Sequence, residues 1–350
     1  MIDSLTSFRF ITALVVFIFH CYIHLGFKLD IKFIDVFFKH GAVFMTGFFV
    51  LSGFIMTHVY QKWDFSKPSL IKEFYLKRFA KIYPVYIVAT ILFFTFFANE
   101  FTSREWARII VNDLFLTQGF FKNMFTLGFN GGTWSLSVEM FLYALFPFLI
   151  LISGKSPKIL WFALGLSLIV TLNAITDRAD HIYPNPIMRL CDFMAGIGFY
   201  ALKDKPLFRR RDFHIAVILL LVVSTAFLSN RANFMGCHTL SVFLFGAWVA
   251  CTYHSKSWIY TNKPLIFLGL ISYSFYIWQF LALKIGKQFL YMGPAAASLI
   301  TFGMNICLSI LSYYLLEEAA RRMILSRYGK KPSHAANMVP PAGIEPASRT

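Results

Sequence analysis

Long apolar runs, separated by short polar segments, follow one another along the chain up to about position 316. A membrane-spanning helix needs about 20 mostly apolar residues, with a range of about 17–25. About ten runs approach this length, and several lie at its short end. They are residues 8–27, 41–60, 82–98, 134–153, 158–175, 187–202, 213–229, 237–253, 264–283 and 293–316. The pattern predicts an all-α fold, a polytopic membrane protein with about ten transmembrane helices.

The polar segments between these runs predict one membrane domain over residues 1–327, followed by a tail. No polar connection is long enough for a separate soluble domain, since the longest are residues 61–81 and 99–133. Residues 104–121 alternate polar and apolar positions at roughly helical spacing, so we expect them to lie in the membrane interface. Residues 328–350 are rich in Pro, Ala and Ser, and we expect this tail to be disordered.

The composition agrees with a membrane environment. Hydrophobic residues make up 57% of the 350 residues, and charged residues make up only 14%. Soluble domains carry roughly 25% charged residues, because most of their surface must face water. A chain so poor in charge has lipid as its main solvent.

The net charge of +16 raises the alternative of nucleic-acid binding, and the distribution of the charge decides against it. With the N-terminus in the cytoplasm, 22 of the 33 Lys and Arg residues fall on the cytoplasmic side of the predicted helices. This asymmetry is the positive-inside bias of membrane proteins. It predicts that both termini are cytoplasmic and that the partners are membrane lipids, with no nucleic acid.

Five cysteines are scattered along the chain, within or beside predicted helices. They form no CxxC pair and no spacing typical of a metal site. We interpret them as small buried apolar residues and predict no metal. They are Cys21, Cys191, Cys237, Cys251 and Cys307.

The first apolar run holds two ionisable residues, Arg9 and His20. Eleven positions make almost three helical turns, so both side chains share one face, about 16 Å apart along the axis. Ionisable groups inside membrane helices are functional candidates. The alternative is an Arg that reaches the membrane surface and a His satisfied by a neighbouring helix. The run lacks a basic n-region and a small-residue cleavage site, so we expect it to remain as a membrane helix.

A second candidate group lies at residues 132–139, Gly-Thr-Trp-Ser-Leu-Ser-Val-Glu. Glu139 falls about one turn inside the following apolar helix, where a carboxylate needs a partner such as His or Arg. The alternative is a charge at a helix start, favoured there by the helix dipole.

A third candidate group lies at the predicted cytoplasmic start of the third helix. Arg78 and Lys81 are three residues apart, share a helix face and could hold a phosphate-bearing ligand. Ordinary positive-inside anchoring is the alternative. Within residues 48–54, Ser52 and Gly53 favour close helix packing. Arg189 and the pair at 317–318 are further charges that need partners.

Taken together, these motifs resemble the acyltransferase-3 family of membrane-bound O-acyltransferases, which modify bacterial surface glycans. The resemblance extends from about residue 5 to residue 322 and follows the family's order of motifs. The matching segments are Arg9 to His20, FFVLSGF at 48–54, KRFAKIYPVY at 77–86, WSLSVEMFLYALFP at 134–147, RLCDFMAGIGF at 189–199, LGLISYSFYIW at 268–278 and LSYYLLEEAARR at 311–322.

The resemblance implies a multi-pass protein of the bacterial cytoplasmic (inner) membrane. It implies a cytoplasmic acyl-CoA donor, usually acetyl-CoA, and a glycan acceptor at the outer face. The acceptor stays open among O-antigen, exopolysaccharide, peptidoglycan and similar glycans, and the acyl group stays open between acetyl and succinyl.

The resemblance also implies roles for single residues. Arg9 and His20 match the family's essential pair, and Arg78 matches the first arginine of its RxxR motif. The central motif is matched by Trp134, Ser135 and Glu139.

Three positions depart from the family pattern. Lys81 replaces the second arginine of RxxR, which keeps the charge but loses the bidentate fork. Gln279 stands where many members have His, and the closing Glu-x-Pro becomes Glu317-Glu318-Ala319. These departures put a catalytic role for position 279 and the affinity for the donor in doubt.

The expected reaction is acyl transfer from a thioester to an alcohol. His20 is expected to act as the base, or as a transient acyl carrier, with Glu139 orienting it. Arg9, Arg78 and Lys81 are expected to anchor the CoA phosphates. A support role is expected for a second set of residues, in which Ser135 could also stabilise the oxyanion: Trp134, Ser135 and Arg189.

Two other classes of protein are alternatives to an acyltransferase. A proton-coupled transporter or a lipid-linked glycan flippase would use His20, Glu139 and Arg189 as a proton or substrate path. Transporters often show internal repeats, and inspection of the two halves finds none. A receptor or scaffold would not need charges along the first helix.

Overall fold

The computed structural model describes residues 2–97, 102–121, 124, 130–154, 156–175, 182–227 and 237–328. No β-strand occurs among these residues, which confirms the predicted all-α fold as far as the described chain extends. The helices are α1 (Asp3–His24), α2 (Lys32–Lys39), α3 (Phe44–Val59), α4 (Pro68–Phe97), α5 (Ser103–Phe115), α7 (Trp134–Ser153), α8 (Ile159–Ile175), α10 (Leu190–Leu202), α11 (Arg211–Phe227), α12 (His238–Tyr253), α13 (Trp258–Thr261), α14 (Lys263–Leu270), α15 (Ser272–Gly286), α16 (Pro294–Ser312) and α17 (Glu318–Tyr328).

Each of the ten predicted apolar runs is largely helical, but the predicted number of membrane spans is not confirmed. By length and composition, five segments of the described chain can cross a membrane, or six if the bent pair α14 and α15 forms one span. The five are Asp3–His24, Gly41–Val59, Pro68–Phe97, Trp134–Ser153 and Pro294–Ser326. Several other apolar helices are too short for a bilayer core about 30 Å thick, as the 13 residues of α10 illustrate. The described part of the chain is therefore all-helical, with several helices long and apolar enough to cross a membrane, and the orientation of the termini stays a prediction.

Two helices differ from their predicted bounds in ways that matter for the site. α4 begins at Pro68, not near position 82, and continues through Pro84 as one helix of 30 residues. Arg78 and Lys81 therefore lie within a long helix and not at its start. The predicted run 264–283 is divided at Ile271 into α14 and α15, which meet at an angle of 68°.

The segment predicted to lie in the interface does contain a helix, α5, which begins at a capping box. Thr102 accepts from the backbone N–H of Glu105, and the Glu105 carboxylate accepts from the Thr102 N–H. This reciprocal pair satisfies two backbone donors that the first turn of a helix leaves free. The predicted disordered tail at 328–350 falls, after Tyr328, outside the described residues.

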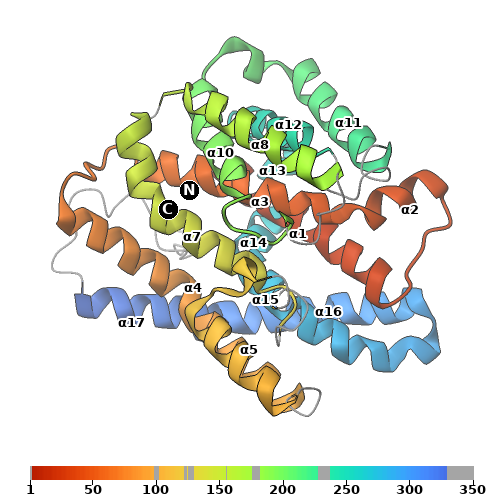
Figure 1. Cartoon of the computed structure of the whole chain (residues 1–350). Coiled ribbons are helices and arrows are strands. Elements are labelled where there is room, and N and C mark those ends of the chain that lie inside the picture. Colours follow the sequence, from red (N-terminus) through yellow and green to blue (C-terminus); the bar gives the residue numbers. More distant parts are fainter. Residues whose placement is uncertain are drawn as a thin grey trace, which may run out of the picture.

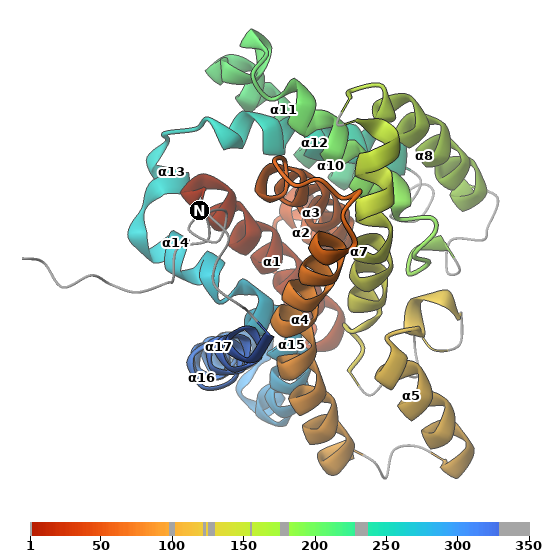
Figure 2. The same cartoon turned by 90° about the vertical axis from the view of Figure 1, so that its left-hand side faces the viewer.

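α1 lies near the middle of the molecule, where it contacts α3, α12, α14 and α15 (Figure 2). α3 and α10 form the closest helix pair of the bundle. At Gly53 and Gly196, an added Cβ would lie only 2.1 and 2.0 Å from backbone oxygens of the partner helix. The glycines therefore let the two backbones touch, which confirms the packing interpretation of Gly53.

α16 and α17 follow one another in line and form the long blue element of Figure 1, in which α16 packs against α15 and α17 packs against α4. A π-helical turn at Tyr313–Glu317 joins them. Such turns are rare within helices and occur frequently at functional sites. Here the turn directs Glu317 into the bundle, where its side chain is fully buried.

Candidate active site

A cavity of about 120 Å³ lies between α1, α3, α4, α7 and α15. Five of the predicted site residues line it, although they come from three helices that are distant in the sequence: Arg9, Arg78, Lys81, Ser135 and Glu139. Its remaining wall is largely aromatic and aliphatic, with Ser52, Ser272 and three tyrosines as further polar groups. A charged cavity inside apolar helices is a site for a polar or charged ligand.

The Glu139 carboxylate is held by hydroxyl groups at the cavity wall. The Ser52 hydroxyl and the Tyr143 hydroxyl each donate to its Oε1 over 3.2 Å. The cationic charges that act on it belong to Arg9 and Arg78. The predicted cation partner of Glu139 is therefore arginine, and His20 is not among the groups that contact the carboxylate.

Arg78 points into the cavity from α4. Its Nη2 donates to the Tyr60 hydroxyl over 3.0 Å, and its guanidinium lies over the rings of Tyr60 and Tyr143. Its Nε is buried and has no hydrogen-bond partner in the described chain. Arg78 thus has donor capacity left for an anionic ligand.

Lys81 is already paired within the protein. Its Nζ donates to Glu317 Oε1, and the second carboxylate oxygen of Glu317 accepts from Ser274 over 3.0 Å. The side chain of Lys81 is one-third exposed, whereas that of Glu317 is fully buried. This contact provides the partner that the sequence required for Glu317, and it joins α4 to the π-helical turn.

His20 does not line the cavity, because it lies three helical turns beyond Arg9 on α1. Its ring stacks on His24 and packs edge-on against Phe280, with ring centroids 5.6 and 4.6 Å away. Its Nδ1 is buried and has no hydrogen-bond partner in the described chain. One imidazole nitrogen is therefore available to an incoming polar group.

The neighbouring Gln279 is 99% buried, and both polar atoms of its amide lack a partner among the described residues. Its Nε2 lies close to Gly132, at the start of α7, and Phe280 covers both Gly131 and Gly132. Unpaired buried amides are costly and call for an explanation such as a ligand or solvent. The sequence could single out position 279 only by its departure from the family pattern.

Of the predicted support residues at the start of α7, Ser135 lines the cavity and Trp134 directly precedes it in the chain. Trp134 is buried, and its ring packs against Tyr183 with centroids 4.8 Å apart. The Ser135 hydroxyl lies 2.8 Å from the Tyr276 hydroxyl and 3.1 Å from the Gly132 carbonyl. Its contacts hold the start of α7 against α15.

Arg189 lies outside the cavity, in a separate buried group. Its Nε donates to the Tyr183 carbonyl, and its Nη1 donates to Thr46 and to Asp192 over 3.0 and 3.2 Å. The partner that the sequence required for Arg189 is therefore Asp192, three residues further along the chain.

The sequence interpretation missed two cavity residues, Ser52 and Tyr143. Ser52 was assigned to helix packing, and its position one residue before the close-packed Gly53 explains why. Tyr143 follows Glu139 by four residues, so the two side chains lie on one helix face. This spacing of four residues was the sequence signal that could have identified Tyr143 as a cavity residue.

Long apolar helices around a charged internal cavity define a polytopic membrane protein with a buried polar site. The chain matches the profile of the acyltransferase-3 family, described as an acyltransferase domain, over residues 2–314. This match covers nearly the whole chain, and the protein therefore belongs to that family of enzymes.

Individual relatives are distant. The chain is 25% identical to the peptidoglycan O-acetyltransferase OatA of Listeria monocytogenes, over 69% of this chain and 45% of that protein. It is 29% identical to the acyltransferase MdmB of Streptomyces mycarofaciens, over 47% of this chain and 44% of that protein. The chain thus spans about half the length of the curated relatives it matches. No solved structure matches it significantly.

Proposed function

We propose that the protein is an O-acyltransferase that moves an acyl group, with acetyl as the first choice, from cytoplasmic acyl-CoA to a hydroxyl of a cell-surface or exported glycan. The observation that carries the proposal is the cavity in which Arg9, Arg78 and Glu139 meet. Membership of the acyltransferase-3 family and the similarity to an O-acetyltransferase and an acyltransferase support the same reaction class.

The arginines are suited to the donor. CoA carries several phosphates, and guanidinium groups bind phosphate through paired hydrogen bonds. Arg78 has an unpaired buried donor, and Arg9 faces the same cavity. Glu139 lines the same cavity, and in this proposal its carboxylate orients the two guanidinium groups and not the His20 imidazole. Lys81 would contribute its charge only after it parts from Glu317.

His20 is suited to the chemical step. About 16 Å of helix separate it from Arg9, and in CoA the extended pantetheine arm separates the phosphates from the thioester. An imidazole nitrogen of His20 accepts the proton of the acceptor hydroxyl as its oxygen attacks the thioester carbonyl. The thiolate of CoA leaves and takes the proton from the imidazolium, which returns His20 to its starting state.

The acceptor would approach from the end of α1 at which His20 and Gln279 lie. The unpaired Gln279 amide can both donate to and accept from sugar hydroxyls, as polar side chains in carbohydrate sites do. Which glycan binds, and whether it belongs to O-antigen, exopolysaccharide or peptidoglycan, are questions for the assay. The predicted bacterial inner-membrane location belongs to this proposal.

The test uses membranes that contain the full-length protein, labelled acetyl-CoA and extracted surface glycan. The label should enter ester linkages of the glycan with the wild type. His20→Ala should reduce this by about 100-fold or more, because general base catalysis contributes roughly 10²–10⁴-fold. His58→Ala is the matched control, since that histidine packs on Tyr200 and Tyr253, away from the cavity.

Unchanged labelling by His20→Ala at equal protein level would refute the role of His20. A transporter or flippase is the second class that the same residues allow. It would move substrate across vesicles without transferring label from acetyl-CoA to glycan. That result would overturn the proposed reaction itself.

A further inference from the structure

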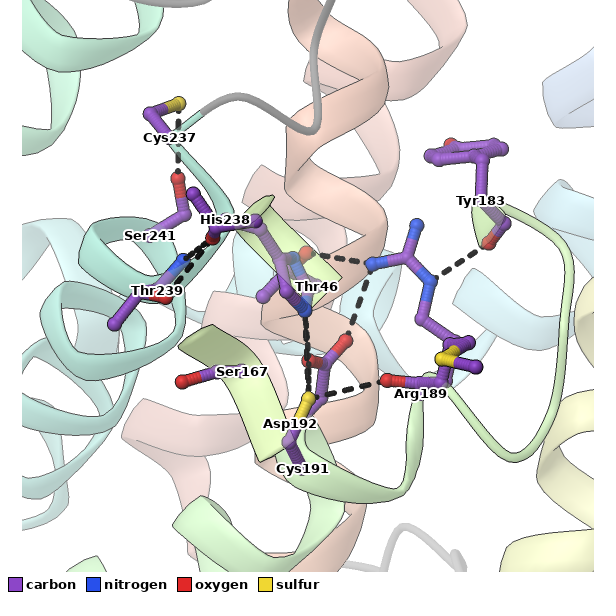
Figure 3. Close-up of polar contacts among 12 residues, drawn as sticks. Thr46, Ser167, Tyr183, Arg189, Cys191, Asp192, Cys237, His238, Thr239 and Ser241 are labelled. Atoms are coloured by element: carbon purple, nitrogen blue, oxygen red, sulfur yellow. Dashed lines mark hydrogen bonds and ion pairs between the residues drawn. The ribbon is translucent and has the colours of Figure 1, made fainter. Parts of the chain in front are cut away.

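A second group of reactive side chains lies outside the cavity, where α10 and α12 begin (Figure 3). Cys191 and Asp192 lie in the first turn of α10, and His238 is the first residue of α12. All three side chains are buried, with at most 1% exposed. One potential ligand atom from each lies within 4.8 Å of the others.

The three atoms converge on one point instead of forming a relay. His238 Nε2 lies 3.0 Å from Asp192 Oδ1 and 3.4 Å from Cys191 Sγ, and these last two atoms are also 3.4 Å apart. In a catalytic triad the nucleophile and the carboxylate contact opposite nitrogens of the imidazole. Here both face the same nitrogen, and burial excludes a substrate. Nucleophilic catalysis is therefore a poor explanation of the group.

The spacing fits a tetrahedral zinc ion. Zinc binds sulfur at about 2.3 Å and imidazole nitrogen or carboxylate oxygen at about 2.0–2.2 Å, so neighbouring ligand atoms are about 3.3–3.6 Å apart. The observed separations of 3.0–3.4 Å differ from these by a few tenths of an ångström. Thiolate, imidazole and carboxylate are all ligands that zinc accepts.

The charges also fit. A thiolate and a carboxylate together match the two positive charges of zinc, and Asp192 is at the same time the counterion of Arg189. Arg189 donates to Asp192 Oδ2, which leaves Oδ1 directed at the histidine and cysteine. Hydrogen bonds of this kind orient the ligands of metal sites.

We propose that Cys191 Sγ, Asp192 Oδ1 and His238 Nε2 bind a zinc ion that fastens the start of α10 to the start of α12, with a solvent oxygen as the fourth ligand. The site is separate from the acyl-transfer cavity and does not depend on the proposed reaction. Sequence spacing gave no sign of it, because the ligands come from two segments 47 residues apart. The sequence prediction of no metal is revised by this proposal.

The full-length protein is purified in detergent without chelator, and its metals are measured by mass spectrometry. About one zinc per chain is expected. Metal-free protein is then titrated with Co²⁺, which should give a thiolate-to-cobalt charge-transfer band that equimolar Zn²⁺ removes. Cys191→Ser and His238→Gln should each lose the band and most of the zinc.

Cys237→Ser is the matched control. That cysteine directly precedes His238, but its sulfur contacts Ser241 and is not part of the group. This variant should keep both the zinc and the cobalt band. If the Cys191 and His238 variants fail to accumulate, the zinc content and the cobalt titration of the wild-type protein decide whether the group binds metal.

Wild-type protein without stoichiometric zinc, and without a cobalt band, would overturn the proposal. The group would then be a hydrogen-bonded network in which the Cys191 thiol donates to Asp192 and to the Met188 carbonyl. Glycan acylation is measured on the same samples, so failure of the zinc site and failure of the proposed reaction are told apart.

Discussion

The cavity around Glu139 and the buried group around Asp192 both bring charges into an apolar bundle, but they satisfy those charges differently. Among the described residues, Glu139 accepts hydrogen bonds from the neutral hydroxyls of Ser52 and Tyr143, and it shares a cavity with Arg9 and Arg78. Asp192 directly contacts both Arg189 and His238, and none of these side chains is more than 1% exposed.

This difference indicates what each region is for. Charges that touch inside the bundle hold its helices together, so the Asp192 group is assigned to stability, with the proposed zinc ion as part of it. Charges that face a cavity keep capacity for an incoming ion. The predictions below test whether stability and activity divide between the two regions in this way.

The largest effect is expected from Asp192→Ala. Removing one partner of a buried ion pair costs about 3–5 kcal/mol, because the Arg189 guanidinium then stays buried without its counterion. The free energy of unfolding of the detergent-solubilised protein should fall by that amount. A variant as stable as the wild type would remove the contrast between the two regions.

A third buried carboxylate, Asp113, sharpens the contrast because its side chain has only neutral partners. Gln118 Nε2 donates to its Oδ1 over 2.7 Å, and burial raises its pKa to about 7. Because the folded pKa exceeds the unfolded value of about 3.9, the folded protein binds the proton more tightly. Stability should therefore be highest below about pH 4, fall as the pH rises to about 7, and stay constant above it.

Each pKa unit corresponds to about 1.4 kcal/mol, so the loss amounts to a few kcal/mol. Melting temperatures measured from pH 5 to pH 8 should show the decline in the wild type. Asp113→Asn, which keeps an acceptor for Gln118 but cannot ionise, should flatten the profile. An equal slope in both proteins would assign the pH dependence to other groups.

Glu139→Gln should separate the cavity from the buried group. The amide keeps the shape and an acceptor for Ser52 but removes the negative charge that Arg9 and Arg78 face in the cavity. Hydrogen bonds that involve a charged group contribute about 1.5–3 kcal/mol, so acyl transfer should fall roughly 10- to 100-fold. The melting temperature should change little. Strong destabilisation with normal specific activity would make Glu139 a structural residue.

Much of the helical pattern follows directly from the sequence. α7 occupies residues 134–153, as the apolar run predicted, and Gly154 ends it in a left-handed conformation with φ of +55°. Glycine is favoured there because it has no Cβ to clash. Arg9 and His20 likewise lie on one continuous helix.

The remaining features depend on packing between distant segments. The pair of Lys81 and Glu317 joins residues 236 positions apart, and it arises from a π-helical turn that hydropathy does not signal. The predicted number of membrane spans stays unconfirmed for a similar reason. An apolar run shows that a segment avoids water, but neighbouring helices can bury it as well as lipid can, so short helices such as α10 need not cross the membrane alone.

The smallest effect on the enzyme is expected from Arg78→Lys. Lysine keeps the charge but loses the planar fork that binds phosphate through two hydrogen bonds. The KM for acyl-CoA should rise about 10-fold while kcat stays nearly constant, because the arginine binds the donor equally in the ground and transition states.

Lys77→Gln is the control for this variant, because Lys77 is the neighbouring cation on α4 and pairs with Glu73 on a partly exposed face. Exposed pairs of this kind contribute about 0.3–0.5 kcal/mol, so its KM should stay within about twofold of the wild type. A similar KM for both variants would mean that α4 attracts the donor through its overall positive charge. The affinity for acyl-CoA would then come from the positive charges along α4 as a group and not from the Arg78 guanidinium.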